Sequence, residues 1–149
     1  MTIVAAATRP EFSDVLNAVI TRRGYSVLSM EALDAAAAEE PLMMLFLAGD
    51  HWRLAESDDV AAILPELDQA LGGHARIVVA TRDDERALQR RYRFTAFPAL
   101  VFLRDGQYLG VIEGMKDWSD YLVDIPDILG REPSDPPAYQ LPAGCSGTH

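Results

Sequence analysis

The first part of the chain alternates apolar and polar residues with helical spacing. Thr8 and Glu11 are typical of a helix start, and Gly24 is typical of a helix end. Between them, apolar residues follow one another at i, i+3, i+4, i+7 and i+8: Phe12, Val15, Leu16, Val19 and Ile20. The pattern then predicts a short strand at residues 25–28 and an alanine-rich helix at residues 30–40.

Two continuous apolar runs, residues 42–48 and 76–80, predict strands buried on both faces, as in a sheet that helices cover on each side. A polar loop follows the first run, and Ser57 is then expected to cap a helix. Its apolar stripe is Val60, Ile63, Leu64, Leu67 and Leu71. Pro65 lies inside this stripe and is expected to kink the helix.

The second half of the chain predicts a hairpin between two helices. Asp83 is expected to cap a short helix that runs to residue 92, and strands at 99–103 and 107–112 are joined at an Asp-Gly turn. A last helix is expected to open at Asp117. The residues expected on its inward face are Trp118, Tyr121, Leu122 and Ile125.

This order of elements predicts an α/β fold. A βαβ unit followed by a hairpin and a closing helix gives a mixed central β-sheet flanked by helices. We expect one domain over residues 1–130. Residues 131–149 contain four prolines and lose the periodic pattern, so we expect a flexible C-terminal tail there.

Composition narrows the classes of function. The longest apolar run, seven residues at 42–48, is too short to cross a bilayer, and the N-terminus lacks a basic signal-peptide region. We therefore expect a cytoplasmic protein with no membrane insertion. Cys145 is the one cysteine, which permits no internal disulfide and no cysteine-based metal site.

The net charge of −10 argues against nucleic-acid binding, which needs a basic face. The acids are concentrated: residues 29–70 hold ten acids and one base, Arg53, a net charge of −9. This segment is either a solvated surface that maintains solubility or a surface that attracts a basic partner.

The sequence offers few residues that could form a metal, cofactor or catalytic site. The three histidines are far apart, so a zinc site with Asp50 or Glu39 is not expected, and we predict neither a metal nor a cofactor. No nucleophile-elbow or triad spacing is present. The arginines of residues 82–93 are interpreted as a solvated helix face that pairs with nearby acids, or as a contact site for an acidic partner region.

From about residue 42 to 129 the chain resembles thioredoxin. The residues that carry this resemblance are the buried strand, the proline-interrupted helix and the run Tyr92-Arg93-Phe94-Thr95-Ala96-Phe97-Pro98-Ala99-Leu100. The resemblance implies a cis bond between Phe97 and Pro98. In thioredoxins a Cys-x-x-Cys pair lies between the first buried strand and the interrupted helix, but residues 49–57 contain no cysteine. Because disulfide exchange needs a thiolate, we do not expect an enzyme.

A narrower resemblance is to the thioredoxin-like hydrogenase expression/formation proteins HupG and HyaE, which lack these thiols. It rests on the segments 63–67, 77–80, 91–102 and 104–114 with Trp118, and it covers roughly residues 10–130. It implies a cytoplasmic chaperone that binds the small subunit precursor of a nickel–iron uptake hydrogenase through its twin-arginine signal peptide. Other hydrogenase maturation proteins are further expected partners. The alternative is a general thioredoxin-like adaptor with a different client.

The expected binding surface combines an acidic rim with an open backbone edge. Acids would attract a basic signal peptide, and the backbone beside a cis-proline can pair with an extended chain. Trp52 is either an exposed contact or packs over the helix. The candidate binding residues are Phe97, Pro98, Asp50, Trp52, Glu56, Asp58 and Asp59.

Overall fold

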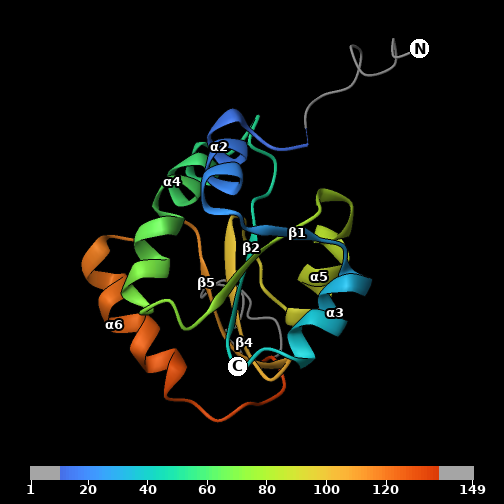
Figure 1. The fold of residues 1–149 in the computed structure, drawn as a ribbon, viewed down its shortest axis with the longest axis vertical. Coiled ribbons are helices and arrows are strands. Elements are labelled where there is room, and N and C mark those ends of the chain that lie inside the picture. The colour runs from blue at the N-terminus through green and yellow to red at the C-terminus, as the bar shows by residue number, and fades with distance from the viewer. Residues whose placement is uncertain (1–10, 138–149) are drawn as a thin grey trace, which may run out of the picture.

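A five-stranded mixed sheet forms the centre of the computed structural model, which describes residues 11–137 (Figure 1). The strands are β1 (Ser26–Leu28), β2 (Met43–Leu47), β3 (Arg76–Ala80), β4 (Ala99–Arg104) and β5 (Gln107–Glu113). Their order in the sheet is β1-β3-β2-β4-β5. β1 and β2 run parallel to β3, whereas β4 is antiparallel to both β2 and β5. The predicted α/β fold with a mixed sheet is confirmed.

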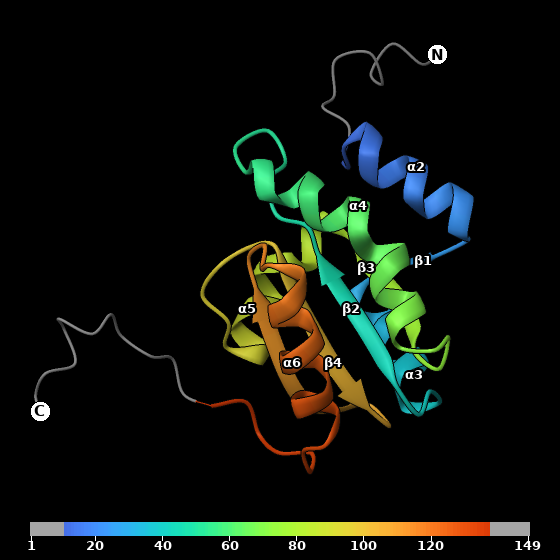
Figure 2. The same cartoon turned by 90° about the vertical axis from the view of Figure 1, so that its left-hand side faces the viewer.

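Helices cover both faces of this sheet. On one face lie α2 (Asp14–Arg23), α4 (Ala55–Ala70) and α6 (Trp118–Leu129). Figure 2 shows α4 and α6 in front of the strands and α2 beside α4. On the other face lie α3 (Met30–Ala38) and α5 (Glu85–Tyr92), which follows a short 3-10 turn, Arg82–Asp84. The order of helices and strands along the chain agrees with the prediction.

The apolar run of β2 divides its side chains between two cores. Met44 and Phe46 lie in the core beneath α2, α4 and α6, whereas Met43, Leu45 and Leu47 lie in the core beneath α3 and α5. All five residues are buried. Because successive side chains of a strand point to opposite faces, a central strand covered on both sides needs an uninterrupted apolar run.

Three helices begin at positions other than the predicted ones. α5 begins at Glu85, and Asp83, its predicted cap, lies within the 3-10 turn before it. α2 begins at Asp14, where the hydroxyl of Ser13 accepts a hydrogen bond from the Leu16 amide at 3.1 Å; the predicted start at Thr8 lies outside the described residues. α4 begins at Ala55, and Ser57, the predicted cap, is a buried residue of its first turn. The loop before α4 is wound into a turn, in which the Arg53 and Leu54 amides donate to the carbonyl of Asp50 at 3.0 and 2.9 Å.

The inward face of α6 is narrower than predicted. Tyr121 and Ile125 are buried as expected, but Trp118 and Leu122 are 43% and 53% exposed. The buried stripe continues with Ile128, so its spacing is i, i+4 and i+7. Trp118 and Leu122 lie beside this stripe, and the sheet does not cover them.

The segment after α6 runs back along the molecule. The Ser134 amide donates to the carbonyl of Tyr108 at 3.1 Å, and the Arg93 guanidinium donates to the carbonyl of Pro136 at 2.9 Å. Residues 131–137 therefore differ from the free segment that the sequence indicates. Cys145 and the rest of the predicted tail lie outside the described residues, and the division at residue 130 stays a prediction.

Candidate functional site

The corner before β4 contains the cis peptide bond between Phe97 and Pro98, which confirms that prediction. Pro98 is buried, and its carbonyl accepts a hydrogen bond from the Gly114 amide at 2.7 Å, just after β5. Phe97 is half-buried. Its ring meets the edge of Phe94 at 5.2 Å, and the Arg86 guanidinium lies 5.4 Å from the ring centroid.

Glu113 positions the segment that leads to this corner. Its carboxylate accepts hydrogen bonds from the Thr95 amide at 2.7 Å and from the Thr95 hydroxyl at 3.1 Å. Within residues 11–137, the N–H and C=O of Phe97 form no hydrogen bond. A held but unpaired backbone segment is suited to pairing with an extended chain. Sequence reasoning did not select Glu113, because a carboxylate at the end of a strand carries no signal of its partner.

The loop that follows β2 packs directly against the corner. Gly49 has a φ of +75°, and a Cβ at this position would lie 2.6 Å from the Cβ of Phe97 and 2.9 Å from Cδ1 of Leu54. Only glycine fits both the backbone conformation and this close approach. The cysteine-free loop and the cis-proline corner therefore share one region of the molecule.

Glu85 holds the loop that follows β2 in place. This buried carboxylate accepts a hydrogen bond from the Gly49 amide at 3.1 Å and forms an ion pair with Arg82. Burial raises the pKa of Glu85, and the guanidinium of Arg82 and the backbone donors of Gly49 and Ala48 oppose that effect. Sequence reasoning did not select Glu85, because nothing in the sequence shows that this side chain turns inward.

One of the four candidate acids lies on the surface beside the corner, and a second lies three residues further along the same helix. Glu56 and Asp59 are exposed on the first turns of α4. The Glu56 carboxylate accepts a hydrogen bond from the Met115 amide at 3.3 Å, and a Cβ on Gly114 would lie 3.7 Å from it. Glu56 therefore lies next to the residues that bond to Pro98, which places the start of α4 at the rim of the corner.

The other two acids are more involved in the local structure. Asp50 accepts a hydrogen bond from the Trp52 amide at 3.0 Å and lies 3.9 Å from the Arg53 guanidinium. Asp58 is half-buried, and its Oδ1 is buried without a hydrogen-bond partner among the described residues. Trp52 is 57% exposed, with its ring 5.0 Å from that of His51, which favours the exposed alternative for this residue.

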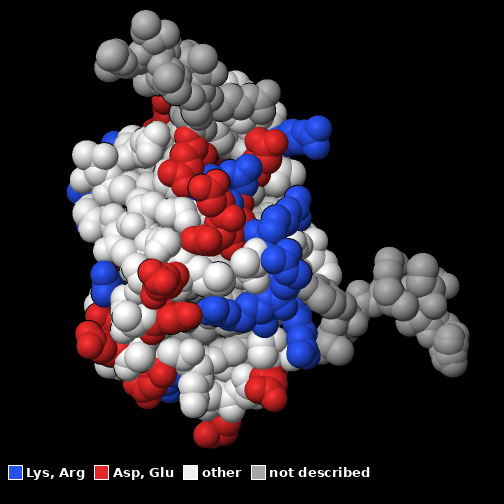
Figure 3. All heavy atoms as spheres, turned by 90° about the vertical axis from the view of Figure 1, so that its right-hand side faces the viewer, with Lys and Arg blue, Asp and Glu red and all other residues white. Residues whose placement is uncertain are grey.

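The opposite side of the corner carries a group of arginines next to acids. Figure 3 shows Lys and Arg side chains gathered in a stripe on the face that α5 and α3 cover. Part of this cluster is paired, as the sequence suggested: Arg82 with Glu85 and Arg91 with Asp34. Arg86 instead lies over Phe97. The corner thus has exposed carboxylates towards α4 and an arginine towards α5.

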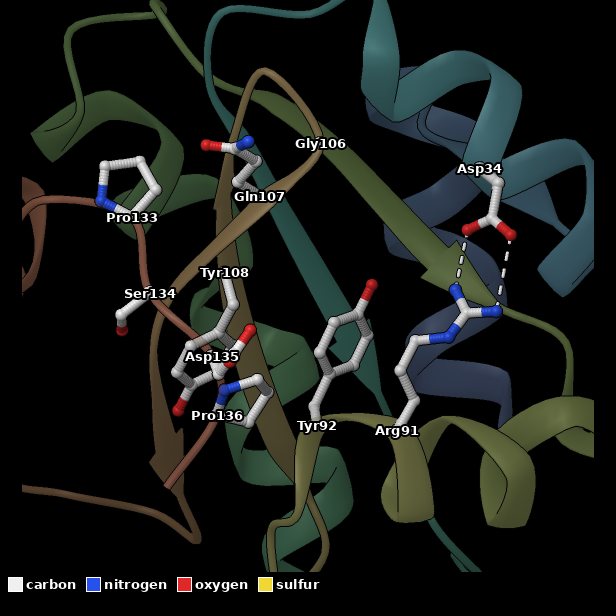
Figure 4. A pocket seen from close by; sticks show the side chains of 10 residues that line it. All are labelled: Asp34, Arg91, Tyr92, Gly106, Gln107, Tyr108, Pro133, Ser134, Asp135 and Pro136. Atoms are coloured by element: carbon white, nitrogen blue, oxygen red, sulfur yellow. Dashed lines mark hydrogen bonds and ion pairs between the residues drawn. The ribbon is translucent and has the colours of Figure 1, made fainter. Parts of the chain in front are cut away.

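A separate hollow of about 560 Å³ lies between α3, α5, the start of β5 and residues 133–136 (Figure 4). Tyr92 and Tyr108 stack within it at 6.0 Å, and burial raises the pKa of both phenols. Its one lining arginine, Arg91, is held by two hydrogen bonds to Asp34, at 2.6 and 3.3 Å. Because that guanidinium is already occupied, we place the candidate site at the corner and not here.

Within residues 11–137, no three His, Cys, Asp or Glu side chains are grouped in a way that would hold a metal ion. In the same part of the chain, no helix combines the length and the apolar character that spanning a membrane requires.

The sheet order, the cis-proline corner and the helix that starts beside it define a thioredoxin-like domain without thiols in its β2–α4 loop. Mitochondrial thioredoxin 3 of Saccharomyces cerevisiae has a similar structure, with a TM-score of 0.58 and 19% identity over 70% of this chain and 96% of that chain. This likeness shows the fold.

Sequence comparison identifies the family. Residues 15–121 match the family described as Hydrogenase-1 expression protein HyaE. The hydrogenase expression/formation protein HoxO of Azotobacter vinelandii is 40% identical over 134 residues, 90% of each chain. HupG of Bradyrhizobium diazoefficiens is 38% identical, covering 75% of this chain and 78% of that one. The crystal structure of a putative HupG from Rhodopseudomonas palustris has a TM-score of 0.51 and 31% identity, covering 70% and 94% of the two chains. The chain belongs to this family of hydrogenase expression/formation proteins.

Proposed function

We propose that this protein is a redox-inactive chaperone that binds the small subunit precursor of a nickel–iron uptake hydrogenase in the cytoplasm. The bound element is the twin-arginine signal peptide of the precursor, and other hydrogenase maturation proteins are further partners. Membership of the hydrogenase expression/formation family supports the choice of client.

The observation that carries the proposal is the contact between the cysteine-free loop and the corner at Phe97. A Cβ on Gly49 would lie 2.6 Å from the Cβ of Phe97, so the loop packs against the corner, and residues 49–57 offer no thiol for disulfide exchange. What this region offers is an unpaired stretch of backbone with carboxylates beside it. Backbone groups and carboxylates can bind an extended chain, but they cannot carry out disulfide exchange. The proposed role is therefore binding without an enzymatic step.

The charges around the corner suggest how the peptide is oriented. Glu56 and Asp59 would receive its arginines on the α4 side, whereas Arg86 disfavours a basic residue on the α5 side. The backbone of Phe97 would pair with the extended peptide as in strand addition. The two arginines must then point towards α4.

Co-purification tests the function. The tagged protein should capture the small subunit precursor at low ionic strength and lose it when the two signal-peptide arginines are replaced by glutamine. The double variant Glu56→Gln, Asp59→Asn should weaken capture about five- to tenfold, because each exposed ion pair contributes about 0.2–1 kcal/mol. Raising the salt concentration should reduce the difference between variant and wild type.

A matched control is Glu66→Gln, which removes an exposed acid further along α4 and should leave capture unchanged. A second control is an unrelated precursor that also carries twin arginines. Equal capture of both precursors would contradict the hydrogenase-specific role and favour a general adaptor.

A further inference from the structure

Several large apolar side chains at the start of α6 and in the turn before it are exposed to solvent and lie outside the core. Among the described residues, the large hydrophobic side chains that are at least a third exposed are Val15, Val27, Trp52, Met115, Trp118, Leu122 and Val123. Three of these seven, Met115, Trp118 and Leu122, lie in the turn before α6 and on its first turns, and Val123 is on the same helix but does not line the hollow described below. Scattered exposed apolar residues need no explanation, but a cluster of this kind marks an interaction surface.

The cluster borders a small hollow between α4 and α6. The hollow has a volume of about 60 Å³, room for the end of one aliphatic side chain. Its lining residues are Leu67, Ala70, Trp118, Tyr121, Leu122, Ile125 and Pro126. Trp118 meets Tyr121 edge-on at 6.2 Å, so an aromatic wall forms one side. A pocket with apolar walls and an aromatic edge suits an aliphatic anchor.

The hollow is connected to the rim of the cis-proline corner. The Met115 amide donates to Glu56 at 3.3 Å, and the Tyr121 hydroxyl accepts a hydrogen bond from the Lys116 amide at 3.2 Å. The turn before α6 therefore links the acid of the corner to a residue of the hollow. A peptide bound at Glu56 would therefore lie next to the turn before α6, and this turn leads to Trp118 and Leu122.

The segment that carries the hollow is acidic along the sequence: residues 113–127 contain five acids and one base, Lys116. Three of these acids, Glu113, Asp124 and Asp127, line a different hollow between β5 and α6, whereas Asp117 and Asp120 flank Trp118 at the start of α6. A second copy of this chain is therefore a poor occupant, since two surfaces of the same sign would face each other. A segment that combines basic and apolar residues fits both the rim and the hollow.

We propose that the hollow between α4 and α6 binds an aliphatic side chain from the apolar stretch that follows the arginines of the client signal peptide. This inference rests on the proposed function and adds a second contact to it. Signal peptides place an apolar stretch of about 7–15 residues after their basic region. The arginines would bind at Glu56 and Asp59, and the apolar stretch would continue across Met115 to Trp118 and Leu122.

Two synthetic peptides test the second contact. One is the signal peptide of the small subunit, and the other has the same arginines with every aliphatic residue of the apolar stretch replaced by serine. The wild-type protein should bind the first peptide about tenfold more tightly or better, the equivalent of burying one aliphatic side chain. Leu122→Gln and Trp118→Gln should remove most of this difference and leave the affinity for the serine peptide unchanged.

Val123→Gln is the matched control, because Val123 is 69% exposed on the same helix but does not line the hollow. This variant should bind both peptides as the wild type does. Circular dichroism of all three variants checks that loss of binding is not loss of folding.

Each outcome separates the two proposals. Equal affinity of the wild-type protein for both peptides would overturn the contact at the hollow and leave arginine-dependent binding in place. Binding of neither peptide would refute the proposed function, and the hollow contact with it. Sedimentation velocity decides the remaining case: a wild-type dimer that Leu122→Gln converts to a monomer would show that a second copy covers the hollow, and would overturn the proposal.

Discussion

The carboxyl group of Glu85 lies beneath the loop that follows β2 and accepts a hydrogen bond from the Gly49 amide. Because Gly49 touches Phe97, this one buried side chain holds in place the two segments that form the candidate site. Burial disfavours its charged form and raises its pKa above the ordinary value of 4.5. The folded protein therefore binds a proton at Glu85 more tightly than the unfolded chain does.

Glu85→Gln should change the pH dependence of stability. With more protons bound in the folded state, the free energy of unfolding of the wild type falls as the pH rises from 4.5 through the raised pKa, by at most about 1.4 kcal/mol per pH unit. The variant lacks this component. Urea unfolding of both proteins between pH 4.5 and 8 should show the wild type losing stability relative to the variant. A relative gain with rising pH would mean that the pKa is lowered in the folded state.

At the scale of elements, the segment after α6 connects the two faces of the sheet. It leaves α6 on one face, bonds to the carbonyl of Tyr108 at the start of β5, and reaches Arg93 at the end of α5 on the other face. The Arg104 guanidinium also donates to the carbonyl of Arg131 at 3.2 Å. The bond to Tyr108 pairs one backbone group on the edge strand β5, which would otherwise stay unpaired.

A chain that ends at Arg131 should be less stable than one that ends at Pro137. The shorter chain loses the bonds of Ser134 and Pro136, and each hydrogen bond contributes about 0.5–1.5 kcal/mol, so we expect a loss of about 1–3 kcal/mol. Thermal or urea unfolding measures the difference. The chain that ends at Pro137 is the matched control, since it keeps both bonds. Equal stability of the two truncated chains would show that the segment contributes nothing.

At the scale of the whole molecule, the charges are separated around the corner. The start of α4 presents Glu56 and Asp59, whereas α5 presents the arginine stripe that Figure 3 shows. A protein with a net charge of −10 attracts basic chains from a distance, but the stripe gives such a chain one preferred side. Orientation of the client thus follows from where the few bases lie and not from the net charge.

Arg86→Gln should strengthen the binding of the signal peptide. The change removes a positive charge that lies over Phe97, and we expect about a two- to fivefold gain in affinity at low salt, the range of an exposed charge pair. Isothermal calorimetry at two salt concentrations measures it, and the gain should shrink at the higher one. Arg90→Gln, one helical turn further along α5, is the control for the change in net charge. An equal gain from both variants would show that only net charge matters.

Much of the fold is set by local patterns in the sequence. The continuous apolar runs of β2 and β3, the Asp-Gly turn between β4 and β5, and the helical stripes predicted the order of elements because the spacing of apolar residues follows the geometry of each element. The helix starts were less predictable. Serine is a common helix cap, so the sequence predicted a helix start at Ser57. In the structure the chain already turns at Asp50 and α4 begins at Ala55, which only the folded loop shows.

The sequence by itself determined that the chain is an α/β domain, that residues 49–57 carry no thiol, and that residues 29–70 are strongly acidic. These are properties of composition and of neighbouring residues. The tertiary structure decided which distant residues meet: Glu85 with Gly49, 36 positions apart, and Glu56 with Met115, 59 positions apart. It also decided that Trp118 and Leu122 stay exposed, because the packing of α6 on the sheet covers only one narrow stripe of that helix. Contacts of this kind depend on how elements pack, and local periodicity carries no record of that.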